Sequence, residues 1–159
     1  VRSRRQRQMC IRDSLYRAVD AEGNTLDWML SAKRNKEAAE KFFKQMLSND
    51  YCKSPRVMNF DKNPSYPPAF KNLKENGLIS RDTEFRQIKY LNNIIEQDHR
   101  FIKRRVRHSQ WLQTFETAKA TISGYESMHM IRKGQIEGVR KKDIVSQKKF
   151  IDNLFGIAA

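Results

Sequence analysis

The chain has 159 residues, with 32 Lys and Arg against 18 Asp and Glu, which gives a formal net charge of +14. This length suits one domain with a hydrophobic core and is short for two. The positive charge favours a polyanionic partner, because basic side chains bound to phosphates release counterions. No apolar run approaches the length of a membrane span and the N-terminus lacks a signal-peptide core, so we expect a cytoplasmic protein. The two cysteines, Cys10 and Cys52, imply neither a disulfide framework nor a zinc cluster.

Residues 15–48 carry the pattern of a hairpin followed by a helix. Leu15, Arg17 and Val19 alternate with Tyr16 and Ala18. After a glycine-containing turn, Leu26, Trp28 and Leu30 alternate with Asp27 and Met29. This pattern predicts two antiparallel strands. Asn35 is a candidate N-cap, and apolar residues then recur every three to four positions, so we expect an amphipathic helix over residues 36–48 that covers the hairpin.

Strands and helices alternate in the rest of the chain. Val57–Phe60 is short and apolar, which predicts a buried parallel strand that ends at Asp61. The pattern then predicts a helix ending near Gly77, a strand at 84–88, and helices at about 92–107 and 114–134. The tail has a weak apolar patch that fits either a short docked helix or a frayed end. The order of elements predicts an α/β fold with one mixed sheet and helices on its faces.

Two carboxylates are candidate site residues. Asp61 follows an apolar strand, and open α/β folds bind ligands at the carboxyl ends of their strands. Glu96 lies 35 positions later in a predicted helix, with Lys103 seven residues beyond it on the same face. We place Asn92 and His99 on that face as well, opposite an apolar stripe made of Leu91, Ile94, Ile95 and Ile102. Each carboxylate also has a simpler interpretation: Asp61 begins a turn, and Glu96 forms a surface ion pair with Arg100.

Two carboxylates directed at one place suit Mg²⁺ or Mn²⁺, which prefer oxygen ligands and keep positions open for water and phosphate. A pair of such ions can activate a hydroxyl and stabilise the leaving oxygen. The reaction implied is phosphodiester cleavage or transfer.

Basic residues next to the carboxylates predict contact with DNA phosphates. A charge run is usually a solvated helix face, but this one directly follows Glu96 on the same predicted helix, and we favour the functional interpretation. The candidate DNA-binding residues are Lys62, Lys103, Arg104, Arg105 and Arg107. The three histidines, His99, His108 and His129, have no ligand spacing, and we interpret them as surface or packing residues.

Three segments, Leu15–Asp20, Asn59–Tyr66 and Arg86–His99, resemble the DDE transposases of bacterial insertion sequences, specifically the insertion-sequence-six family. The resemblance covers about residues 15–134, which we take as the catalytic core. It implies an RNase H-like (retroviral-integrase-like) fold and metal-dependent cutting of element ends with joining to target DNA. By the same resemblance Asp61 and Glu96 are the second and third acidic metal ligands and Lys103 is the basic residue that follows. The full-length protein is expected to be a homo-oligomer.

The first acidic ligand of that family has no match. In the family it lies on a strand just before the segment that Leu15–Asp20 resembles, in a Trp-x-x-Asp-Glu-Thr-Tyr type motif that this sequence lacks, as it lacks the family's N-terminal helix-turn-helix. We therefore expect the first strand to be missing and the chain to be inactive.

Residues 1–14 resemble an in-frame translation of a sequencing-library adapter, and we treat them as non-native. They hold five Arg and one Asp, and removing this +4 from +14 leaves +10 on the remaining chain. The basic character of the protein therefore does not depend on them.

Two other functions stay open on the sequence alone. One is a noncatalytic basic module that holds nucleic acid through 103–107 and 132–142, the second range reaching into a basic tail at 135–159. The other is ribonuclease H or another RNase H-like nuclease, which shares the predicted fold. The block from Asn92 to His99 favours the transposase.

Overall fold

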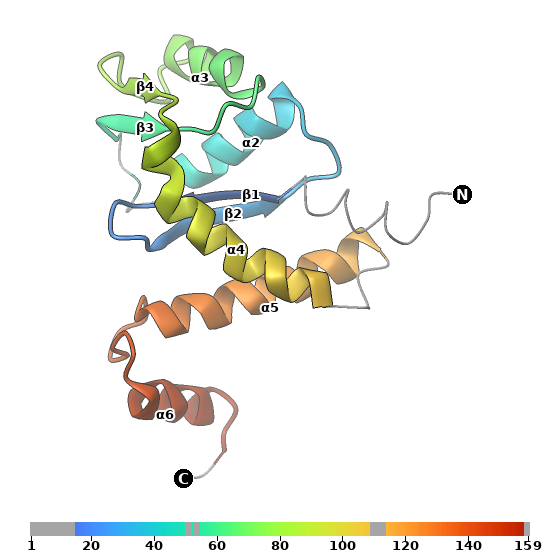
Figure 1. Cartoon of the computed structure of the whole chain (residues 1–159), viewed down its shortest axis with the longest axis vertical. Coiled ribbons are helices and arrows are strands. Elements are labelled where there is room, and N and C mark those ends of the chain that lie inside the picture. The colour runs from blue at the N-terminus through green and yellow to red at the C-terminus, as the bar shows by residue number, and fades with distance from the viewer. Residues whose placement is uncertain (1–14, 50–51, 53–54, 109–113, 158–159) are drawn as a thin grey trace.

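The computed structural model describes residues 15–49, 52, 55–108 and 114–157. The segment 1–14, predicted to be non-native, lies outside these residues. Along the chain the structure contains β1 (Leu15–Val19), β2 (Thr25–Leu30), α2 (Lys36–Leu47), β3 (Val57–Asn59), α3 (Tyr66–Glu75), β4 (Glu84–Arg86), η1 (Lys89–Asn92), α4 (Asn93–His108), α5 (Phe115–Lys133) and α6 (Ile144–Leu154) (Figure 1).

Local chemistry accounts for the helix ends. The Asn35 side chain accepts a hydrogen bond from the Ala38 amide at 3.1 Å, which confirms the predicted N-cap of α2. Thr114 and Thr117 form a reciprocal capping box at the start of α5. Gly134 ends α5 in the left-handed conformation, with φ of 74°. The tail does form a helix, α6, but none of its residues is buried.

The strands form two sheets instead of the single mixed sheet that the sequence predicts. β1 pairs with β2 in an antiparallel ladder that sets Leu15 opposite Leu30, and β3 runs parallel to β4, as expected. Within the described residues each sheet has only these two strands. In Figure 1 the strands follow one another as β4, β3, β1 and β2. β1 and β3 do not pair with each other, and residues of both line one cavity.

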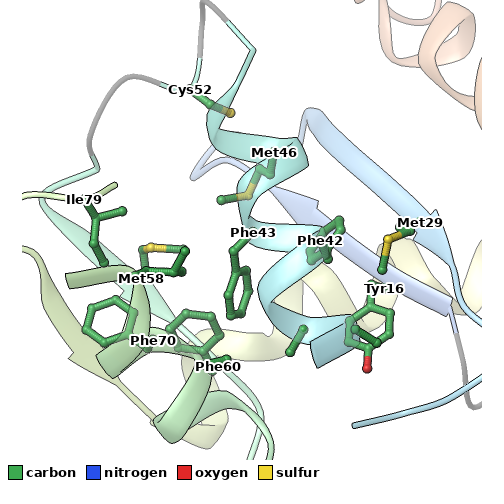
Figure 2. Close-up of a cluster of buried hydrophobic side chains, with 14 residues drawn as sticks. Tyr16, Met29, Phe42, Phe43, Met46, Cys52, Met58, Phe60, Phe70 and Ile79 are labelled. Atoms are coloured by element: carbon green, nitrogen blue, oxygen red, sulfur yellow. The ribbon is translucent and has the colours of Figure 1, made fainter. Parts of the chain in front are cut away.

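An aromatic core joins the two sheets beneath α2 and α3 (Figure 2). Phe60 is at its centre, with its ring centroid 4.9 Å from that of Phe85 and 5.4 Å from that of Phe43. Tyr16 brings the hairpin into the same cluster through Phe42, at 5.6 Å between centroids. Aromatic contacts of this kind stabilise beyond the area they bury. These aromatic contacts therefore fix β3 and Phe60, the residue that follows it, relative to the hairpin.

Helix α4 buries a different face from the one that the sequence predicts. Ile102 is fully buried, as expected, in a second cluster with Val106 and residues of β1, β2 and α5. Leu91 and Ile94, which the apolar pattern assigns to the buried stripe, are 41% and 45% exposed. Leu91 and Ile94 instead line the cavity, while Ile102 and Val106 lie on the side of α4 that packs against the hairpin and α5.

None of the helices among the described residues combines the length and the apolar character that crossing a membrane requires.

Replacing Phe43 by alanine tests the aromatic core. Phe43 is 2% exposed and contacts Phe42, Phe60 and Tyr66, so its loss leaves a cavity. We expect Phe43→Ala to lower the free energy of unfolding by about 3–5 kcal/mol, measured by urea denaturation. Phe155, 70% exposed, is the matched control, and Phe155→Ala should change it by less than about 0.5 kcal/mol. Equal losses in both variants would contradict this account of the core.

Candidate nucleic-acid and metal site

A cavity of about 1110 Å³ separates β1 from β3. Most of its lining comes from the two strands, α2 and α4, and single residues of β2 and α3 and two residues of η1 complete it. We call it the groove, and define it by Leu15, Ala18, Phe43, Met58, Ile95 and His99. It is large enough for a ligand and is lined by both apolar and charged side chains.

Asp61 lies at the end of β3 and lines the groove. Its side chain is 55% exposed, and one oxygen accepts a hydrogen bond from the Asn63 amide at 2.9 Å. The other oxygen is 3.5 Å from the Arg34 guanidinium. Asp61 therefore begins the turn, in agreement with the simpler interpretation, and still presents a carboxylate to the groove.

Glu96 and Lys103 also line the groove, on α4. Both are exposed, and Glu96 lies in the first turn of its helix. Among the ion pairs of the described residues none joins Glu96 to Arg100, the partner in the simpler interpretation. Two carboxylates that are 35 positions apart in the sequence thus line the same groove.

The basic residues predicted to bind DNA divide into two groups. Arg104 and Arg107 line the groove with Lys103. Arg105 instead lies over the ring of Phe101, 4.8 Å from its centroid, on the side of α4 that packs against α5. Lys62 is exposed beside Asp61 and is not part of the groove wall. A basic wall therefore continues along α4 from Glu96.

Two asparagines connect the segments that bear the carboxylates. The Asn92 amide donates to the Phe60 carbonyl at 3.0 Å, one residue before Asp61, and accepts a hydrogen bond from Asn59. Asn59 also accepts from the Ile88 backbone at 3.2 Å. Asn92 is one helical turn before Glu96, so this bridge ties the start of α4 to the segment that ends in Asp61. Sequence reasoning places Asn92 beside Glu96 but does not identify this role.

A buried charge cluster fixes α4 against β1 and α5. We call it the Arg17 cluster, and it consists of Arg17, Asp98, Glu126, His129 and Lys133. Arg17 is 2.6 Å from a carboxylate oxygen of Asp98 and forms a two-pronged pair with Glu126 at 2.6 and 2.7 Å. The Arg17 and Glu126 side chains are 0% and 1% exposed. No sequence pattern signals this cluster, because a charged residue on a helix is ordinarily solvated.

The remaining members of the cluster surround Asp98. His129 and Lys133, both on α5, contact one oxygen of Asp98 at 2.6 and 2.5 Å. The His129 ring also stacks on Phe101, with 4.1 Å between centroids, which agrees with its interpretation as a packing residue. Burial alone would raise the pKa of Asp98, but the hydrogen bonds and the nearby positive charges outweigh it and hold that pKa well below its usual range.

His99 faces the groove as a neutral side chain. Burial, together with the charges of Arg17 and Lys103, lowers its pKa to about 3. Its Nε2 atom is buried and has no hydrogen-bond partner among the described residues. His99 is thus a part of the groove wall together with Glu96 and Lys103, whose helix face it was predicted to share.

Asp61 and Glu96 offer the oxygen ligands that Mg²⁺ and Mn²⁺ prefer, so the donor chemistry fits such an ion. The described residues contain no group of three Cys, His, Asp or Glu side chains placed to hold one.

Comparison with known families identifies the class. A family described as a DDE domain matches residues 12–135, most of the chain. The chain belongs to this family of DDE domains, and the family implies the RNase H-like fold that the sequence predicts.

Two staphylococcal relatives are transposases. The chain is 39% identical over 119 residues, 75% of its length, to the transposase for insertion sequence-like element IS431mec of Staphylococcus aureus strain Mu50. It is equally similar to the Staphylococcus aureus transposase for insertion sequence element IS257 in transposon Tn4003. An uncharacterized protein of Yersinia pseudotuberculosis, pYV0051, is 40% identical over 68 residues, which are 42% of this chain and 64% of that protein. The chain spans 50% of the length of both staphylococcal transposases. No solved structure gives a significant match.

The pKa of Asp98 makes stability depend on pH. Because its folded pKa lies below the unfolded value of about 3.9, the carboxylate stabilises the fold above pH 4 and loses this effect as the pH falls toward the folded pKa. We expect Asp98→Asn to cost about 3–5 kcal/mol at pH 7, since Arg17 and Lys133 lose their shared partner. The difference from wild type should shrink below about pH 4.

Urea denaturation at several pH values measures this effect. Glu75→Gln, at an acid whose side chain is 59% exposed, is the matched control and should change the unfolding free energy by less than about 0.5 kcal/mol. A difference between wild type and Asp98→Asn that stays constant down to pH 2 would show that the Asp98 charge does not contribute to stability.

Proposed function

We propose that the chain is part of the catalytic domain of an insertion-sequence transposase, which cuts DNA and joins the freed ends to a target. The observation that carries the proposal is that Asp61 and Glu96 line one groove, which has a basic wall, in a chain of the DDE-domain family. In this proposal the two carboxylates are metal ligands. Mg²⁺ or Mn²⁺ ions, when bound, would supply activation of the attacking hydroxyl and charge stabilisation at the leaving oxygen.

The other residues bind and orient DNA. Lys103 lies seven residues after Glu96, so it can hold a phosphate two helical turns from the carboxylate. Arg104 and Arg107 extend this contact along α4. Contacts of this kind position the backbone without reading the base sequence. We assign the core to residues 15–134 and propose that the full-length protein acts as a homo-oligomer.

We further propose that the chain cannot catalyse the reaction by itself. The sequence lacks the motif that carries the first aspartate of the family, and the described residues give the groove no third ligand. The cavity between β1 and β3 is consistent with a missing first strand, because it lies between two strands that do not pair with each other. A noncatalytic basic module remains the second candidate, favoured by the basic wall of α4.

A plasmid-nicking assay tests the catalytic part. We expect no nicking of supercoiled DNA by the chain in Mg²⁺ or Mn²⁺, because the described residues supply no third acidic ligand of the set that the family resemblance implies. The same assay on an RNA–DNA hybrid tests for a ribonuclease H and should also show no cleavage. Metal-dependent nicking that disappears in Asp61→Ala would mean that two carboxylates suffice.

DNA binding tests the basic wall. A triple variant, Lys103→Ala, Arg104→Ala and Arg107→Ala, should bind duplex DNA more weakly. The slope of log affinity against log salt should fall by about one unit for each phosphate that the variant no longer binds. Fluorescence anisotropy in EDTA over a salt series measures both quantities.

Matched variants separate this contact from general charge. A second triple variant, Lys41→Ala, Lys44→Ala and Lys71→Ala, removes the same charge from α2 and α3, outside the groove wall, and should leave the slope nearly unchanged. Asp61→Asn and Glu96→Gln should not weaken binding, since each removes a negative charge from the groove. Equal effects of the two triple variants would contradict a specific role for α4.

A further inference from the structure

Helix α6 has an apolar face that no other described element covers. Ile144 and Val145, at its start, are both 78% exposed, and Phe155, at its C-terminal cap, is 70% exposed, while none of the helix residues is buried. Because successive helix residues are about 100° apart around the axis, these three side chains project within about 100° of one another. In Figure 1 α6 lies beyond α5, at the end of the molecule opposite α2 and α3.

The charges of α6 cancel, although the whole chain carries a formal charge of +14. The charged residues of the helix and its N-cap are Asp143, Lys148, Lys149 and Asp152. Lys148 and Asp152 form an ion pair, and helical geometry places both in the middle of the apolar face. Two copies of a strongly positive chain repel each other, and the repulsion is weakest where their surfaces are neutral. α6 is therefore a place where two copies can approach.

Antiparallel pairing of α6 with α6 of a second copy brings complementary groups together. With the two-fold axis at position 150, Lys148 of one copy faces Asp152 of the other, because the two residues are equally distant from that position. In the same way Val145 faces Phe155. A two-fold interface contains each of these contacts twice. A parallel two-fold pair would instead set each Lys148 beside the Lys148 of the other copy, so the charges select the antiparallel arrangement.

We propose that two copies of this chain associate through α6, as an antiparallel pair of helices. Burial of Ile144, Val145 and Phe155 supplies the driving force, and exchange of the Lys148–Asp152 pairs between the copies sets the direction. A contact this small gives a weak complex, with a dissociation constant of about 10–100 µM, so dilute protein is monomeric. This interface would serve the homo-oligomer proposed above, and so rests on that part of the proposed function.

Nucleic acid and a membrane surface match α6 less well. A DNA-binding surface gains affinity from an excess of Lys and Arg, and α6 with its N-cap has no such excess. A helix that lies on an anionic membrane also carries basic residues over its polar face, whereas Asp143 and Asp152 balance the lysines here. The partner that complements an equal number of acids and bases beside one apolar face is a helix of the same kind.

Sedimentation velocity of the full chain from about 2 to about 200 µM, without DNA or metal, measures the association. Lys148→Glu sets an acid opposite Asp152, and Asp152→Lys sets a base opposite Lys148, so each variant should associate about tenfold more weakly than wild type. Lys71→Glu is the matched control, because it makes the same charge change as Lys148→Glu and breaks the same kind of i,i+4 pair, with Glu75, on α3. It should associate as wild type does.

An equimolar mixture of Lys148→Glu and Asp152→Lys gives the sharpest test. In the mixed pair every charge at these two positions faces an opposite charge, so association should return to within about threefold of wild type. Circular dichroism verifies that each variant is folded; if one is not, Val145→Asp, at an exposed side chain, takes its place and should weaken association about tenfold. A wild-type chain that stays monomeric, equal association of Lys148→Glu and Lys71→Glu, or a mixture of folded variants that stays monomeric would overturn the proposal.

Two further outcomes would assign α6 or the oligomer contact differently. Co-sedimentation with phosphatidylglycerol vesicles that Val145→Asp abolishes would show instead that α6 binds a membrane surface. Association that neither Lys148→Glu nor Asp152→Lys weakens would place the contact between copies on another surface and overturn this one alone. Because DNA and metal are absent from the experiment, its failure leaves the function proposed for the groove standing, and failure of DNA binding at α4 leaves this interface standing.

Discussion

The geometry of the site depends on one buried arginine. Arg17 comes from the hairpin, yet its guanidinium binds Asp98 of α4 and Glu126 of α5. Arg17 and Lys133 balance the charges of Asp98 and Glu126, so the buried cluster is close to neutral. A guanidinium suits two buried carboxylates better than an ammonium does, because its planar set of N–H donors can form hydrogen bonds to both carboxylates at once. Such a cluster contributes specificity of packing more than net stability.

The cluster acts on the site through the helix it holds. Asp98 is two residues from Glu96, so fixing Asp98 to β1 also fixes the rotation of α4 about its axis, and with it the direction of Glu96. The asparagine bridge through Asn92 fixes the same helix to the end of β3. One link sets how α4 is turned and the other sets where it begins. Between them, the carboxylates of Asp61 and Glu96 reach one groove although their own side chains are exposed.

Much of this arrangement is predictable from local sequence signals. The hairpin, the cap at Asn35, the parallel strand before Asp61 and the helix carrying Glu96 and Lys103 all follow from periodicity and capping. The division into two sheets cannot be predicted in this way, because strand pairing depends on contacts between residues distant in the sequence. The exposure of Leu91 and Ile94 escapes prediction for the same reason: an apolar stripe shows that a helix face seeks burial, not that a partner is present. Charged core residues such as Glu126 contradict ordinary hydropathy and carry no pattern of their own.

The glycine that ends α5 gives the tail its direction. The chain after α5 folds back so closely that a Cβ atom at Gly134 would lie 2.5 Å from the Lys141 backbone nitrogen. There is therefore no room for a side chain at this position. Next to it, the Gln135 side chain donates to the Thr25 carbonyl at 2.9 Å and accepts from the Thr25 amide at 2.9 Å, as a neighbouring peptide group would. The path of residues 135–142 is therefore set by the hairpin as well as by the helix before it. Any side chain at position 134 would redirect the basic segment that follows while leaving the groove as it is.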